Sequence, residues 1–147
     1  MDKKREDDIF YVCTMKEYVA RITNNHRKYI VECLDEKNIR HELRVAEVNH
    51  CLSFEQVADE WIERYNIKKG NYDTVKECKY DVPEVTAIGR VYQQLILDTI
   101  NDNDDIKAVK NVFSSFLSDK ISDFNSNIYY SNPSYLKCSY EAGELLD

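Results

Sequence analysis

Residues 53–65 read SFEQVADEWIERY, and this stretch decides the fold class. Ser53 and Gln56 have the S-x-x-Q spacing of a helix capping box, in which each side chain satisfies a backbone N–H group that the first turn leaves unpaired. The apolar residues that follow recur every three or four positions, as on one face of an amphipathic helix. They are Phe54, Val57, Ala58, Trp61, Ile62 and Tyr65. The stretch therefore predicts a helix that buries one side.

The same spacing recurs along most of the chain. A first helix is expected to begin after Asp8, which caps it, and to end at about Thr23. Further helices are expected over 27–36, over 39–50, from Pro83 to about 100, and over 106–124. Residues 66–82 lack such a stripe and predict one long ordered loop. The side chains in the middle of the two strongest stripes should be almost fully buried. These are Trp61, Phe113, Phe116 and Leu117.

Composition points to the same class of fold. The 147 residues include only three glycines and two prolines, too few turn-forming residues for a β-sandwich or barrel. The length suits one domain. We therefore expect an all-α fold, a single bundle of five to six helices over 1–147. Residues 1–7 should be a flexible N-terminus, and 125–147 an ordered C-terminal strap.

Charge and cysteine usage exclude several functions. The chain carries 20 basic and 27 acidic residues, a net charge of −7, and no segment forms a basic patch, so we expect no nucleic-acid partner. No apolar run is long enough for a membrane span or a signal peptide. The five cysteines show no C-x-x-C pair, which favours free thiols in a reducing cytoplasm. Neither metal-ligand spacings nor a Gly-rich nucleotide loop occur, so we expect no metal and no cofactor.

Two arginine–histidine pairs are candidate catalytic residues. Arg21 and His26 have an R-x4-H spacing, and Arg44 and His50 an R-x5-H spacing. Each pair resembles the R-x4-6-H motif of small all-helical ribonucleases of the HEPN class, in which the arginine steadies a phosphate and the histidine moves a proton. Here an apolar residue, rather than the usual polar one, follows each arginine. The structural alternative makes Arg21 a solvated helix-end residue and His50 a partly buried histidine.

The C-terminal segment is the candidate binding region. Residues 125–147 hold four tyrosines and a single basic residue, whereas a fraying terminus is usually charged and poor in aromatics. Tyrosine offers a large contact area with a polar tip, which suits both core packing and protein docking. The candidate binding residues are Tyr129, Tyr130, Asn132, Pro133, Tyr135 and Tyr140.

Three segments carry a resemblance to a known family: residues 11–34, 48–67 and 123–146. Together they resemble small uncharacterised bacterial proteins from predicted toxin–antitoxin-like loci, whose neighbour is ADP-ribosyltransferase-like. The resemblance implies an accessory protein that binds and restrains a partner, the product of an adjacent gene. It implies no active-site residues.

The sequence thus predicts a non-enzymatic, antitoxin-like binding protein that covers a partner's functional surface. The alternative is a HEPN-like dimeric ribonuclease that uses one of the two arginine–histidine pairs. A ribonuclease would place one pair on a shared exposed groove, whereas a binding protein would expose tail tyrosines. The oligomeric state is left open by the sequence.

Overall fold

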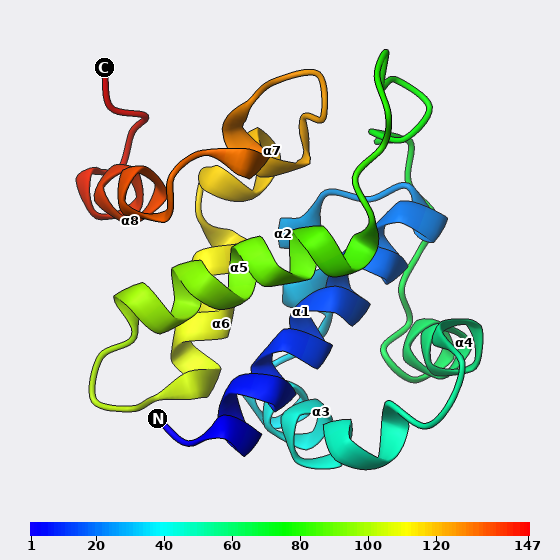
Figure 1. Cartoon of the computed structure of the whole chain (residues 1–147). Coiled ribbons are helices and arrows are strands. Elements are labelled where there is room, and N and C mark those ends of the chain that lie inside the picture. The colour runs from blue at the N-terminus through cyan, green and yellow to red at the C-terminus, as the bar shows by residue number, and fades with distance from the viewer.

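Helices account for every regular element of the computed structural model, which describes residues 1–147 (Figure 1). The absence of strands confirms the all-α prediction. The elements in chain order are α1 (Lys3–Thr23), α2 (Arg27–Cys33), α3 (Glu36–Asn49), α4 (Phe54–Arg64), α5 (Val85–Thr99), α6 (Asp105–Ser114), α7 (Leu117–Ser122), the 3-10 helix η1 (Ile128–Tyr130) and α8 (Pro133–Ala142). None of these helices is both long and apolar enough to cross a membrane.

Helix α1 forms the centre of the bundle. It packs most extensively on α5 and also contacts α2, α3, α4 and α6 (Figure 1). Because neighbours surround it, α1 is buried on several sides, and its core residues include Ile9, Val12, Met15 and Val19. Helices α2 to α6 each pack against this centre with their apolar faces, whereas α7 packs on α2 and α6, and α8 packs on α5.

Two helix starts differ from the sequence prediction. Helix α1 begins at Lys3, where the Asp2 carboxylate accepts a hydrogen bond from the Arg5 backbone N–H, so residues 3–7 are helical rather than flexible. Asp8 lies inside this helix and pairs with Lys4 one turn earlier. Helix α5 begins at Val85, so Pro83 precedes the helix instead of occupying its first turn.

The helix expected over 106–124 is broken in two. The backbone of Ser115 is extended, and its hydroxyl donates to the Val112 carbonyl, a local bond that competes with helix continuation. The break turns Phe116 out of the stripe, so this ring is half-buried, and the prediction of its full burial is wrong. Trp61, Phe113 and Leu117 are fully buried, as expected.

The long loop between α4 and α5 is ordered by the turn between α1 and α2. The backbone N–H of Gly70 donates to the Thr23 carbonyl and that of Tyr72 to the Asn24 carbonyl, both at 2.8 Å. A Cβ atom at Gly70 would lie 2.3 Å from Asn25 Oδ1, so only glycine permits this approach. The loop therefore has a fixed position beside α7.

The C-terminal segment is more helical than its sequence pattern indicates. Asn132 caps α8, Pro133 occupies the first turn, and α8 packs on α5. Leu136 and Ser139 are buried in this contact. The segment thus lies across the bundle, and part of it completes the core.

Candidate functional site

An apolar groove lies between α5 and the C-terminal segment. Its volume is about 420 Å³. One wall comes from α5, and the other from η1 and the start of α8. The lining residues are Ala87, Arg90, Val91, Gln93, Gln94, Leu95, Tyr129, Tyr130, Ser131, Pro133 and Leu136. We call this hollow the tyrosine groove.

Two tyrosines form the aromatic wall of the tyrosine groove. The rings of Tyr129 and Tyr130 meet edge to face, with centroids 4.9 Å apart and an interplanar angle of 76°. Tyr130 is 64% exposed, while Tyr129 packs against the core. The Tyr130 hydroxyl donates to Asn127 Oδ1 at 2.8 Å, which fixes the ring over the groove. A large aromatic surface is therefore held in one orientation and left open to solvent.

The remaining candidate binding residues have different places. Pro133 lines the groove, whereas Asn132 caps α8 through its side chain. The Tyr135 hydroxyl donates to the Leu146 carbonyl and ties down the chain end. Tyr140 is half-buried, and burial raises its pKa. The structure thus groups Tyr129, Tyr130 and Pro133 and assigns structural contacts to the other three.

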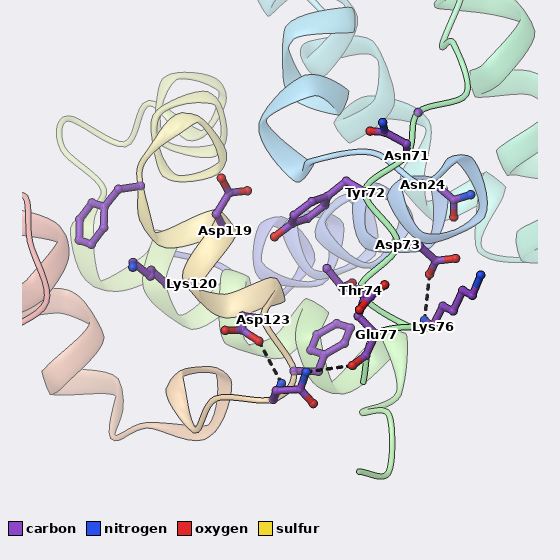
Figure 2. A pocket seen from close by; sticks show the side chains of 14 residues that line it. Asn24, Asn71, Tyr72, Asp73, Thr74, Lys76, Glu77, Asp119, Lys120 and Asp123 are labelled. Carbon is purple, nitrogen blue, oxygen red and sulfur yellow. Dashed lines mark hydrogen bonds between the residues drawn. The ribbon is translucent and has the colours of Figure 1, made fainter. Parts of the chain in front are cut away.

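A second hollow, the polar cleft, separates the loop after α4 from α7 (Figure 2). Its volume is about 890 Å³, and its lining mixes amides, both signs of charge and three aromatic rings. The lining residues are Asn24, Gly70, Asn71, Tyr72, Asp73, Thr74, Lys76, Glu77, Phe116, Asp119, Lys120, Asp123, Phe124 and Asn125. Four of the charged groups are acidic and two are basic, so the lining carries a net charge of −2.

A buried ion network lies below the polar cleft. Glu17 accepts hydrogen bonds from Arg21 Nε at 2.7 Å and from Arg27 Nη2 at 2.6 Å. Burial alone would raise the pKa of Glu17, but the two guanidinium groups outweigh it and hold this pKa below its usual range. The ring of Phe124 covers both guanidiniums, at 4.9 Å from Arg21 and 5.8 Å from Arg27. The network ties α1 to α2 beneath the cleft.

The first arginine–histidine pair lies beside this cleft. His26 Nδ1 is 2.8 Å from Asp119 Oδ1, and its ring stacks on Tyr72 with centroids 3.7 Å apart. Arg21 is not the solvated residue of the structural alternative, because Glu17 holds it and little of its side chain is exposed. Its Nη2 atom is buried and has no hydrogen-bond partner. Asp119 and Tyr72 lie far from His26 in sequence, and no local pattern indicates that they meet.

The second pair is not brought together. Arg44 Nη2 lies 3.3 Å from His41 Nδ1 on the same helix. His50 is exposed rather than partly buried, and it lines a separate hollow with Lys4 and Arg90. Six residues along a helix also turn the two side chains toward different sides.

Groups of three or more histidine, cysteine, aspartate or glutamate side chains that could hold a metal ion do not occur. Comparisons of the chain with protein-family models, with curated proteins and with solved structures give no match. The fold and the hollows together define an all-α protein with one apolar, tyrosine-lined groove and one polar cleft. The shape and lining of these two hollows are therefore the observations from which a function is inferred.

Proposed function

We propose that the protein is a non-catalytic binding protein whose tyrosine groove receives apolar side chains of a partner protein. The observation that carries this proposal is the state of Tyr130, a 64% exposed aromatic ring held over an apolar hollow. Exposed apolar surface costs free energy in an isolated protein and commonly marks an interaction site. Tyrosine is also among the residues that contribute most to binding energy at interfaces.

The construction of the groove supports the proposal. Ala87, Val91 and Leu95 follow one another four residues apart and form an apolar stripe along α5. Arg90 and Gln94, both exposed, flank this stripe. An apolar centre with a polar rim is the usual anatomy of a protein interface. The groove thus suits one or two apolar side chains from a partner.

The proposal includes an antitoxin-like mechanism, in which the bound protein covers a functional surface of its partner. The resemblance of residues 11–34, 48–67 and 123–146 to proteins of toxin–antitoxin-like loci supports this part, and it names the product of an adjacent gene as the partner to test. The mechanism is steric and requires no catalytic residue in this chain.

Site-specific photo-crosslinking tests the proposal. A benzophenone amino acid placed at position 130 should capture one major protein in the cell of origin, the product of the adjacent gene. The same amino acid at Tyr80, which is 71% exposed and lies outside the groove, is the matched control and should not capture that protein. Capture of the same protein from both positions, or from neither, would contradict the proposal.

A second candidate function is RNA cleavage, and one observation favours it. The Asp119 carboxylate holds His26 at 2.8 Å beside the polar cleft, which is how general acid–base histidines are oriented. Purified protein, incubated with a mixed-sequence RNA, provides the test. Under this proposal His26→Ala abolishes cleavage and His50→Ala leaves it unchanged. Equal cleavage by both variants and the wild type would contradict it.

A further inference from the structure

Lys16 is an unpaired amine in the core of the bundle. It lies in the middle of α1, its exposed fraction is 0%, and Nζ has no hydrogen-bond partner. Of the other buried charged side chains, Glu17 and Arg27 are paired with each other, and Glu42 accepts hydrogen bonds from neutral groups. A lone charge in a protein interior is costly, so Lys16 requires a physical explanation.

Aromatic rings cover the amine on two sides. Nζ lies 5.7 Å from the centre of the Trp61 ring of α4 and 5.5 Å from that of Phe113 of α6. The two rings offer a cation–π contact to the charged amine, which offsets only part of the lost hydration. Trp61 is thus the part of α4 that shields Lys16 from water.

The titratable groups around Lys16 come from three helices. They are Cys13 on α1 itself, Cys33 on α2 and Glu42 on α3. Glu42 does not bond to the amine. Its carboxylate instead accepts hydrogen bonds from Trp61 Nε1, at 3.0 Å, and from the Tyr65 hydroxyl. The nearby negative charge therefore holds α4 in place rather than pairing with Lys16.

Helix α4 is the element that can release the amine. It lies at the edge of the bundle, and α1 is its one extensive helical neighbour (Figure 1). An exposed turn at 50–53 precedes α4 and the long loop follows it, so opening of α4 breaks mainly its contacts with α1 and its hydrogen bonds to Glu42 of α3. Elements with few neighbours open at lower free energy than the core does.

We propose that Lys16 is a pH-sensitive latch for α4: the neutral amine keeps α4 closed on α1, and protonation of Nζ favours an open state in which Trp61 leaves the amine and water hydrates it. The latch is independent of the tyrosine groove, which α4 does not line.

The direction of the pH effect follows from the burial of Lys16. Burial lowers the pKa of this amine to about 8 in the closed state, against 10.5 when exposed. Between these two values the open state binds more protons, so raising the pH favours closing. From about pH 6.5 to about pH 9 the opening equilibrium constant should fall about tenfold. Cys13 and Tyr65 act in the opposite direction, because burial raises the pKa of both groups in the closed state, to about 12 for Cys13, so a rising pH favours an open state that exposes them. Their effect begins only as the pH approaches the ordinary values of 9.0 for the thiol and 10.0 for the phenol, at the upper end of this range.

Hydrogen exchange across α4 tests the latch. The exchange rate of peptides covering 54–64, divided by the intrinsic rate at each pH, should fall about tenfold from about pH 6.5 to about pH 9. Acrylamide quenching of Trp61, the one tryptophan of the chain, should decrease over the same range. Lys16→Met should remove both trends, whereas Lys28→Met, at an exposed lysine of α2, should keep them.

Three outcomes would overturn the latch. One is a ratio of exchange rate to intrinsic rate that does not change with pH in the wild type. This outcome overturns the latch even if Lys16→Met fails to fold. Another is an unchanged trend in Lys16→Met. The third is an equal trend in peptides of α5, which would mean that the whole molecule opens rather than α4.

Discussion

The ring of Phe124 meets the ring of Tyr129 edge to face, with centroids 5.9 Å apart and an interplanar angle of 89°. Phe124 lines the polar cleft, and Tyr129 lines the tyrosine groove. One aromatic contact therefore separates the two hollows. The same Phe124 ring also covers the guanidiniums of Arg21 and Arg27.

Removal of the Phe124 ring should destabilise the protein strongly. Phe124 is 3% exposed, so Phe124→Ala should lower the free energy of unfolding by about 3–5 kcal/mol in a denaturant titration. The control is Phe116→Ala, which removes the same ring from a half-buried position and should cost less than half as much. Equal losses of unfolding free energy from the two variants would show that the Phe124 ring is not the buried ring that separates the two hollows.

The ion network at Glu17 should be sensitive to loss of one partner. Glu17→Gln leaves Arg21 and Arg27 without a buried counter-charge and should cost about 3–5 kcal/mol of unfolding free energy. Glu32→Gln, at an exposed glutamate of α2, is the matched control and should change stability by less than about 0.5 kcal/mol.

The same network predicts the acid sensitivity of the fold. Because the folded pKa of Glu17 is lowered, the unfolded state takes up its proton first as the pH falls below about 4.3. The contribution of Glu17 to the free energy of unfolding is fully present at neutral pH. It is lost as the pH falls through the lowered pKa that Glu17 has in the folded state. The difference in unfolding free energy between wild type and Glu17→Gln should therefore shrink in acid. A difference that is constant from about pH 7 to about pH 3 would contradict the lowered pKa.

Gly70 should not tolerate a side chain. A Cβ atom there would lie 2.6 Å from the Asn24 carbonyl oxygen, so Gly70→Ala must push the loop away from the α1–α2 turn. We expect a loss of about 1–3 kcal/mol and faster proteolysis between residues 66 and 84. Gly143→Ala meets no atom, but its φ of +79° strains a side chain and should itself cost about 1 kcal/mol, so it is the control for loop proteolysis, which it should leave unchanged. Should Gly70→Ala resist proteolysis as well as the wild type does, the close approach is wrong.

The five thiols should all be free and should differ in reactivity. Cys51 and Cys138 are exposed and should react with Ellman's reagent at once. Cys13 is buried, and burial raises its pKa to about 12, so it should react only after unfolding. Titration in denaturant without reductant should count all five. A lower count would reveal a disulfide that the structure does not contain.

Local sequence patterns predicted the helices better than the site. The capping box of Ser53 and Gln56 is present because it depends on residues three apart, and the helix it starts is found where expected. The apolar stripe predicts full burial of Phe116. This is wrong because a serine hydroxyl ends α6, and an apolar stripe does not reveal that event. The contact between His26 and Asp119 joins α7 to the turn before α2, so only the tertiary fold shows it. Aromatic enrichment predicted the tail as a binding region, but not which of its tyrosines stay exposed.

The most direct test of the binding proposal is the affinity of the partner captured at position 130 for two purified variants, Tyr130→Ala and Tyr80→Ala, by isothermal titration calorimetry. We expect Tyr130→Ala to weaken binding about thirtyfold, or about 2 kcal/mol, while its melting temperature stays within about 2 °C of the wild type, because this ring is 64% exposed and adds little to the core. Tyr80→Ala should bind as the wild type does. Wild-type affinity in the Tyr130→Ala variant would contradict the tyrosine groove as the binding site.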